Sequence, residues 1–215
     1  ENEKESGDTV WQTTPTFQSL EDLRNFKPLP IDKAKFEDAI LEEHERIKKI
    51  YEPHTMFLPQ SGGWVFIPSF DTETLITIAE ALNEDVPALE RYWDHTLEEA
   101  ILKNTVTAKH KLSPVIQCCD DIGCKTGLII SPDVIRKHFF SRFKMAIKPL
   151  KDAEIKVIWH SDGYIMEILD DAIACGVDGI DPIDPSAKMD IGAIRKKYIK
   201  LFLVCYVDGS KILPF

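Results

Sequence analysis

Short apolar runs alternate with amphipathic segments along the second half of the chain. From Leu112 onward, four apolar runs predict strands at 115–119, 155–159, 177–180 and 201–206. The segments between them have helical periodicity and predict helices at 131–147, 164–175 and 190–198. Strands that alternate with helices of about ten residues indicate βαβ units and a parallel sheet with right-handed crossovers. A closed barrel and an open doubly wound sheet both fit this pattern.

The first half of the chain is predicted to be mainly helical. The segment 32–51 carries four apolar residues on one helical face, Phe36, Ile40, Ile47 and Ile50. Three further helices are expected to begin at capping residues, with starts at Ser19, Asp71 and Asp85. The helices that start at Asp71 and Asp85 extend to about residues 82 and 109.

The stretch between the helices 32–51 and 71–82 has a different character. Residues 54–58 are apolar enough for a short strand, and the glycines of segment 60–63 permit a tight turn. Residues 64–67 fit either another strand or the entry to the next helix.

Polar residues follow each predicted strand at its C-terminal end. They form four groups: Asp120 and Asp121; His160, Ser161 and Asp162; Asp181 and Asp184; and Asp208. In parallel α/β folds this edge of the sheet binds ligands, because loops and helix N-termini converge there. The pattern therefore predicts a functional site at the C-terminal edge.

Each polar group also has a structural interpretation. Asp184 and Asp190 can equally serve as helix caps, and Asp208 fits an ordinary turn with the glycine that follows it. Asp120 and Asp121 are less ordinary, because adjacent carboxylates repel each other unless a cation or a shared proton intervenes. His160 follows a buried strand, where an imidazole can act as acid, base or metal ligand near neutral pH.

Composition narrows the range of partners. The chain has 215 residues and a formal charge of −10, with a sequence pI near 5.1. This charge disfavours nucleic acid and anionic membranes, which attract Lys and Arg. Since we find no signal core and no apolar run of the roughly 18 residues that cross a bilayer, we expect a soluble cytoplasmic protein. The odd number of cysteines, five, indicates reduced thiols.

Several motifs in this order resemble the uroporphyrinogen decarboxylase-like superfamily, and in particular its methyltransferase-like branch. The motifs are WHSDG at 159–163, GVD at 176–178, DPSA at 184–187, MD at 189–190, DDIG at 120–123, ISP at 130–132 and VDG at 207–209. The segments 8–11 and 20–23 are also similar to the start of that branch. The resemblance spans nearly the whole chain.

The resemblance implies a (β/α)8 TIM barrel. A complete barrel needs about 250 residues, so we expect an incomplete or abbreviated one. We expect residues 1–30 to form an N-terminal extension that packs on the barrel and residues 31–215 to form the barrel domain, giving a single domain overall.

The resemblance also implies a choice of chemistry. Decarboxylases of the superfamily carry an arginine motif that this chain lacks, whereas its thiol methyltransferases bind zinc through a His-x-Cys pair. Here the corresponding residues are His160, Ser161 and Asp162. We therefore expect an enzyme that moves a methyl group from a small O- or N-methyl compound to a thiol or to a corrinoid (cobalamin) cofactor carried by a partner protein. A uroporphyrinogen decarboxylase without a cofactor and a non-catalytic binding module stay open as alternatives.

The site residues follow from the strand ends and the resemblance together. We predict catalytic roles for His160, Asp162 and Asp121, which could also hold zinc. Substrate contacts are predicted for Asp120, Ser161, Asp181 and Asp208. These predictions are also compatible with a protein that forms a homo-oligomer.

Overall fold

The computed structural model describes residues 3–6, 9–12, 16–52, 54–55, 58–59 and 66–205, with the backbone alone at 3–6, 9–12 and 205. Contacts divide the chain into two compact units. One holds residues 1–30 and 65–96, and the other holds 31–64 and 97–215. Helix α4 (Val86–His110) contributes to both. The division predicted at residue 30 stays a prediction.

The first unit combines a β-hairpin with helices. Its elements are β1 (Glu3–Ser6) and β2 (Thr9–Gln12), which pair antiparallel, α1 (Leu20–Asn25), α3 (Thr72–Glu84) and the first part of α4. Each predicted cap accepts a hydrogen bond from a backbone amide: Ser19 from residue 22, Asp71 from residue 74 and Asp85 from residue 88. These three N-caps are confirmed.

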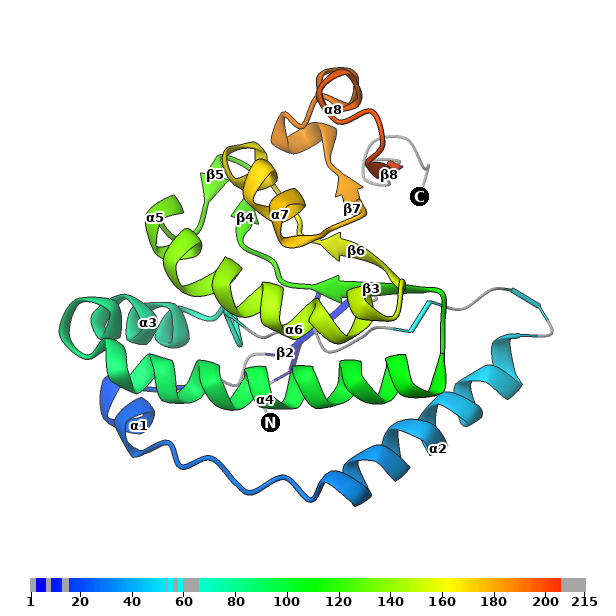
Figure 1. Ribbon diagram of the computed structural model, residues 1–215. Coiled ribbons are helices and arrows are strands. Elements are labelled where there is room, and N and C mark those ends of the chain that lie inside the picture. Colours follow the sequence, from blue (N-terminus) through cyan, green and yellow to red (C-terminus); the bar gives the residue numbers. More distant parts are fainter. Residues whose placement is uncertain are drawn as a thin grey trace. The chain divides into compact units, whose positions relative to one another are not determined.

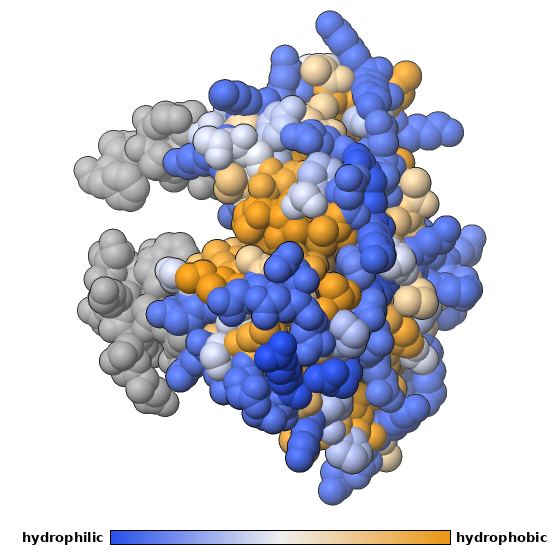
Figure 2. All heavy atoms as spheres, turned by 90° about the vertical axis from the view of Figure 1, so that its left-hand side faces the viewer, coloured by the Kyte–Doolittle hydropathy of each residue, from blue (hydrophilic) through white to orange (hydrophobic). Residues whose placement is uncertain are grey.

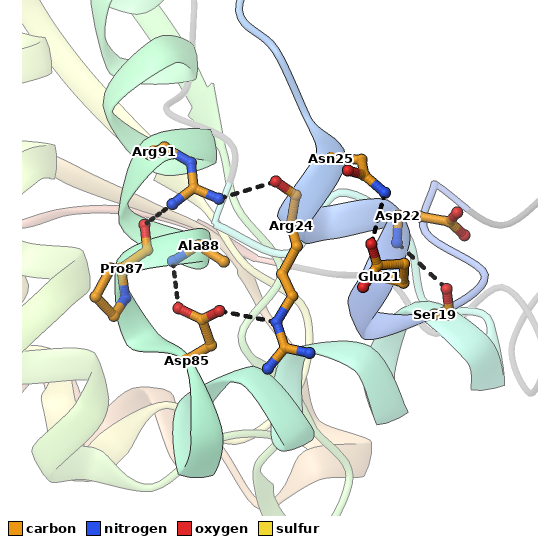
Figure 3. Close-up of polar contacts among 9 residues, drawn as sticks. All are labelled: Ser19, Glu21, Asp22, Arg24, Asn25, Asp85, Pro87, Ala88 and Arg91. Atoms are coloured by element: carbon orange, nitrogen blue, oxygen red, sulfur yellow. Dashed lines mark hydrogen bonds and ion pairs between the residues drawn. The ribbon is translucent and has the colours of Figure 1, made fainter.

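Two arginines tie α1 to the start of α4 (Figure 3). Arg24 Nε donates to Asp85 Oδ2 at 2.9 Å, and the Arg91 guanidinium donates to the carbonyl of Arg24 at 3.1 Å. The hydrogen bond from Arg24 lowers the pKa of Asp85.

Trp93 is fully buried in α4 and stacks on Phe66, with ring centroids 5.0 Å apart. The first unit therefore has its own apolar core.

The second unit begins with α2 (Lys33–Tyr51), close to the predicted limits. Asp32 caps this helix by accepting from Lys35 N at 3.2 Å. Glu37 on α2 lies 2.7 Å from both Lys109 Nζ and His110 Nε2 at the end of α4. Polar contacts on exposed side chains thus connect α2 to the last turn of α4.

The strand predicted at 54–58 is wrong at the residues that the structure describes there. The amides of His54 and Thr55 both donate to the carbonyl of Tyr51, at 2.8 and 2.9 Å, so the chain turns at the end of α2 instead of extending. Residues 56–57, the predicted turn at 60–63 and residues 64–65 lie outside the described residues.

A four-stranded parallel sheet forms the centre of the second unit (Figure 1). Its strands are β3 (Val115–Cys119), β6 (Lys156–His160), β7 (Gly179–Ile183) and β8 (Phe202–Cys205), in the order β3-β6-β7-β8. All three pairings are parallel. The predicted parallel α/β sheet is confirmed, and it is consistent with part of a TIM barrel.

Helices connect the strands as crossovers. They are α5 (Pro132–Val134), the π-helical turn η1 (Ile135–Phe140), α6 (Ser141–Asp152), the 3-10 turn η2 (Met166–Ile168), α7 (Leu169–Cys175), the 3-10 turn η3 (Pro185–Ala187) and α8 (Ile191–Lys197). Helices α6 and α7 cover one face of the sheet (Figure 1). Trp159 of β6 is buried there against Phe139 and Phe143, with ring centroids 5.9 and 6.2 Å apart. Between β3 and α5 a short hairpin forms from β4 (Gly123–Cys124) and β5 (Gly127–Leu128).

Asp178 fastens the N-terminal edge of the sheet. Its carboxylate accepts from Val157 N at 2.9 Å and from Lys156 Nζ at 3.2 Å, and it also pairs with Lys151 Nζ. Burial by itself would raise the pKa of Asp178, but the hydrogen bonds from Lys151 and Val157 outweigh it and lower the pKa. This aspartate, part of the GVD motif, has a structural role between α6, β6 and β7.

Hydrophilic residues cover most of the face shown in Figure 2, and apolar residues reach the surface in patches among them. Within the described part of the chain, no helix is both long and apolar enough to cross a membrane.

We expect Asp178→Asn to destabilise the protein at neutral pH by about 1–3 kcal/mol, because the lysine partners lose their charged acceptor. A pKa that is lower in the folded state contributes stability above the unfolded-state pKa, and this stability is lost as the pH falls through the folded pKa. The gap between variant and parent should therefore narrow below about pH 4. Urea unfolding at pH 7 and pH 3 measures it.

Asp152→Asn is the matched control, because Asp152 forms an exposed ion pair with Lys148 on α6. It should leave the unfolding midpoint almost unchanged. An equal loss in both variants, or a gap for Asp178→Asn that persists in acid, would contradict the role of Asp178.

Candidate functional site

The register of the sheet brings three chemically different residues together at its C-terminal edge. Cys119 on β3 pairs with His160 on β6, and His160 pairs with Asp181 on β7. The residues that follow β3 and β6, Asp121 and Asp162, therefore leave the sheet beside each other. The structure thus brings together the polar residues at the ends of β3 and β6, and Asp181 lies beside them on β7.

His160 lies between two carboxylates. Its Nδ1 is 3.4 Å from Asp181 Oδ2, and its Nε2 is 3.7 Å from Asp121 Oδ1. All three side chains are half-buried, with 28% of His160, 22% of Asp181 and 35% of Asp121 exposed. The imidazole is thus held in place while staying within reach of a ligand.

Asp121, His160 and Asp162 form a group that could hold a metal ion, which we call the Asp–His–Asp triad. Each offers one ligand atom, and these atoms lie within 4.8 Å of one another. One imidazole nitrogen and two carboxylate oxygens suit zinc, with a fourth position left for water or substrate. The donor set of the triad therefore fits the zinc site predicted from the sequence.

The electrostatics of the triad favour a cation. Partial burial raises the pKa of Asp162, and the negative charge of Asp121 raises it further, while His160 opposes the shift. Both carboxylates lie close to the same imidazole nitrogen. A bound cation would offset their repulsion.

Cys119 places a thiol at this edge of the sheet. Burial, followed by the charges of nearby carboxylates, raises its pKa to about 11. Its side chain therefore offers no thiolate nucleophile at neutral pH. The side chain of Cys205, at the end of β8, lies outside the described residues.

One side chain from the WHSDG motif and one from the DDIG motif fasten the loop after β6. Ser161 is fully buried, and its hydroxyl accepts from Ile122 N at 3.2 Å. The amide of Asp162 donates to Asp121 Oδ1 at 2.8 Å. Ser161 holds the loop in this arrangement, and its predicted contact with substrate stays a prediction.

The other predicted residues take different positions. Asp120 is buried, with 7% exposed, and its amide donates to the carbonyl of His160 at 3.0 Å. Asp184 caps η3 through the amide and hydroxyl of Ser186, and Asp190 caps α8, so the structural interpretation holds for both. Asp208 lies outside the described residues. Substrate contacts of Asp120, Asp181 and Asp208 stay predictions.

Sequence reasoning missed Gln117 on β3. Its Nε2 donates a hydrogen bond to Asp181 Oδ2 from two strands away. A signal was present, since Gln117 is the polar residue inside the apolar run 115–119 and such residues need a partner when they are enclosed. That partner is 64 positions further along the chain.

A cavity of about 800 Å³ lies at the other end of the sheet. Its largely apolar lining includes Val115, Lys156 and Phe202, which begin or lie near the start of their strands. The triad does not line it, among the residues that the structure describes. The triad is the stronger candidate for a reactive site, because Asp178 and Lys156, which line this cavity, are already paired with each other.

Comparisons with known proteins give a structural likeness. The chain matches no family model and no curated protein. A solved structure, a methyltransferase from Methanosarcina mazei, superimposes with a TM-score of 0.54 and 20% sequence identity. The match covers 81% of this chain and 49% of that one, so the chain spans about half the length of this neighbour. The likeness supports the α/β fold with its parallel sheet.

Gly163 allows the loop of the triad to pass close to the β4–β5 hairpin. It has a φ of +83°, and a Cβ at this position would lie 2.5 Å from the backbone nitrogen of Cys124. The next amide, of Tyr164, donates to the carbonyl of Cys124 at 2.9 Å. Steric crowding therefore explains why a glycine occupies this position of the WHSDG motif.

We expect Gly163→Ala to destabilise the protein by more than the roughly 1 kcal/mol that a positive φ alone costs an alanine, because backbone atoms must also move. Gly176→Ala is the matched control. Gly176 has a φ of +112°, but its Cβ would meet only the flexible side chain of Lys151 at 3.6 Å. Thermal unfolding of both variants checks this, and equal losses would show that the close approach at Gly163 carries no weight.

Proposed function

We propose that this protein is a methyltransferase that moves a methyl group from a small O- or N-methyl compound to a corrinoid cofactor on a partner protein or to a thiol. The observation that carries the proposal is the Asp–His–Asp triad at the C-terminal edge of a parallel sheet. Enzymes of parallel α/β folds place their chemistry at this edge.

The residues of the triad can meet the main chemical requirement of methyl transfer, which is to stabilise the leaving heteroatom. When the methyl–heteroatom bond breaks, its electron pair stays on the heteroatom, and the methyl group bonds to the electron pair of the acceptor. The heteroatom must then be protonated or stabilised as an anion. His160 in its protonated form can donate that proton, and Asp121 beside it can stabilise the imidazolium. Zinc held by the triad would supply Lewis acidity at the same heteroatom or lower the pKa of a thiol acceptor.

The structural neighbour supports a methyltransferase at a coarse level. That neighbour is a methyltransferase, and the match covers 81% of this chain. Our proposal goes further in three respects: it includes the use of a corrinoid, the class of methyl donor, and the membership of this chain in the uroporphyrinogen decarboxylase-like superfamily.

The charge of the site argues against the decarboxylase alternative. His160 is flanked by the carboxylates of Asp121 and Asp181, with Asp162 close by. A porphyrinogen substrate carries several carboxylates, which such a site repels. A small neutral or cationic methyl compound meets no such barrier.

The parent protein should bind Zn²⁺, and Asp121→Asn should weaken the binding about tenfold or more, because one anionic ligand is lost. Isothermal titration of Zn²⁺ into the chelator-treated protein measures this. Asp190→Asn is the control, because Asp190 caps α8 and should leave the affinity unchanged. The absence of Zn²⁺ binding in the parent would contradict the metal part of the proposal.

His160→Ala should lower methyl transfer at least about a hundredfold with little effect on folding, because the proton donor or ligand is removed. The assay offers a panel of O- and N-methyl compounds with reduced corrinoid or with a thiol. His110→Ala is the matched control, because His110 contacts Glu37 on the surface. An unchanged rate in His160→Ala would refute its role, consumption of uroporphyrinogen would favour the decarboxylase, and neither transfer nor metal binding would favour a binding module.

A further inference from the structure

Three side chains from neighbouring strands share one hydrogen-bonded arrangement at the triad. Gln117 comes from β3, His160 from β6 and Asp181 from β7. Because β6 lies between β3 and β7, the bond from Gln117 to Asp181 spans the strand that carries His160. Side chains two residues apart on a strand share a face, which places Gln117 on the face of Cys119, the register partner of His160.

Asp181 is the common acceptor of this arrangement. Its Oδ2 accepts from Gln117 Nε2 and lies 3.4 Å from His160 Nδ1. An ionised carboxylate can only accept hydrogen bonds, so the ring nitrogen that faces it must carry the proton. A neutral imidazole holds one proton, and the lone pair is then left on Nε2.

Asp121 is less suited to set the tautomer. Its Oδ1 is 3.7 Å from His160 Nε2, which is beyond hydrogen-bond distance, and the same oxygen already accepts from Asp162 N at 2.8 Å. The contact with Asp181 is the shorter of the two and lies within hydrogen-bond distance.

We propose that Gln117 and Asp181 are positioning residues: Gln117 fixes the carboxylate of Asp181, and Asp181 holds His160 as the Nδ1–H tautomer with the Nε2 lone pair on the side of Asp121. Carboxylates that accept from the second nitrogen of a ligating histidine orient the ring and raise its basicity. The tautomer follows from the hydrogen bonds alone. Only its use, to present Nε2 to zinc, rests on the proposed function.

Nitrogen NMR on the metal-free protein tests the tautomer directly. Protein with ¹⁵N-labelled imidazoles is recorded in chelator at a pH above the titration of histidine, and His160→Ala assigns the signal among the six histidines. We expect the parent to show the Nδ1–H pattern, although free histidine prefers Nε2–H. Asp181→Asn, which keeps the shape of the side chain but can donate to Nδ1, should convert His160 to Nε2–H.

Two further variants separate the contributions of the neighbouring residues. Gln117→Leu, which lacks the donor, should shift the population toward Nε2–H without unfolding the protein. Asp121→Asn should keep the Nδ1–H form. An Nε2–H parent would overturn the proposal, as would a tautomer that changes in Asp121→Asn but not in Asp181→Asn.

Zinc affinity distinguishes this inference from the proposed function. If the parent binds Zn²⁺, Asp181→Asn should lower the affinity about 10- to 100-fold and Gln117→Leu by less. Unchanged affinity in Asp181→Asn would overturn the positioning role. If the parent binds no Zn²⁺ and still shows the Nδ1–H tautomer, the metal part of the proposed function fails while the assignment of Gln117 and Asp181 stands.

Discussion

The parallel register of β3, β6 and β7 is the constraint on which the candidate site depends. Cys119, His160 and Asp181 stand side by side because the register pairs Cys119 with His160 and His160 with Asp181. A shift of β7 by one residue would turn Asp181 to the opposite face and remove the acceptor from His160 Nδ1. The buried contacts of Trp159 with the rings of α6 and η1 oppose such shifts in β6, since they determine which face it buries.

The carboxylates at the two edges of the sheet have pKa values shifted in opposite directions. At the N-terminal edge, Asp178 is surrounded by two lysines and a backbone amide, and its pKa is lowered. At the C-terminal edge, Asp162 lies near Asp121 and has a raised pKa. Paired charges at the first edge favour the folded state. Uncompensated negative charge at the second disfavours it, and such an arrangement is typical of sites that bind a cation or transfer protons.

The residues of the WHSDG motif, at the C-terminal edge of the sheet, have two different roles. His160 and Asp162 present side chains to the triad, whereas Ser161 and Gly163 shape the loop that carries them. The motif therefore joins two candidate ligands to two residues with a structural role.

Local features of this protein were readable from its sequence. The caps at Ser19, Asp71, Asp85 and Asp190, the helix that starts after Asp32 and the four parallel strands all depend on residues close together in the chain. The convergence of Asp121, His160 and Asp162 was also predictable, since parallel strands end at a common edge. By contrast, the short apolar stretch near residue 55 gave a wrong strand, because its amides bond back to the end of α2.

Only the tertiary structure decided which side chains meet. The sequence named Asp181 as a substrate contact and passed over Gln117, although the two bond to each other across 64 positions. It could not separate buried Asp120 from Asp121, which faces His160. Hydrophobic periodicity determines which segments become strands and which face of each is buried, whereas strand order and register determine which polar residues become neighbours. Those are set by packing over the whole sheet, and no local pattern in the chain records them.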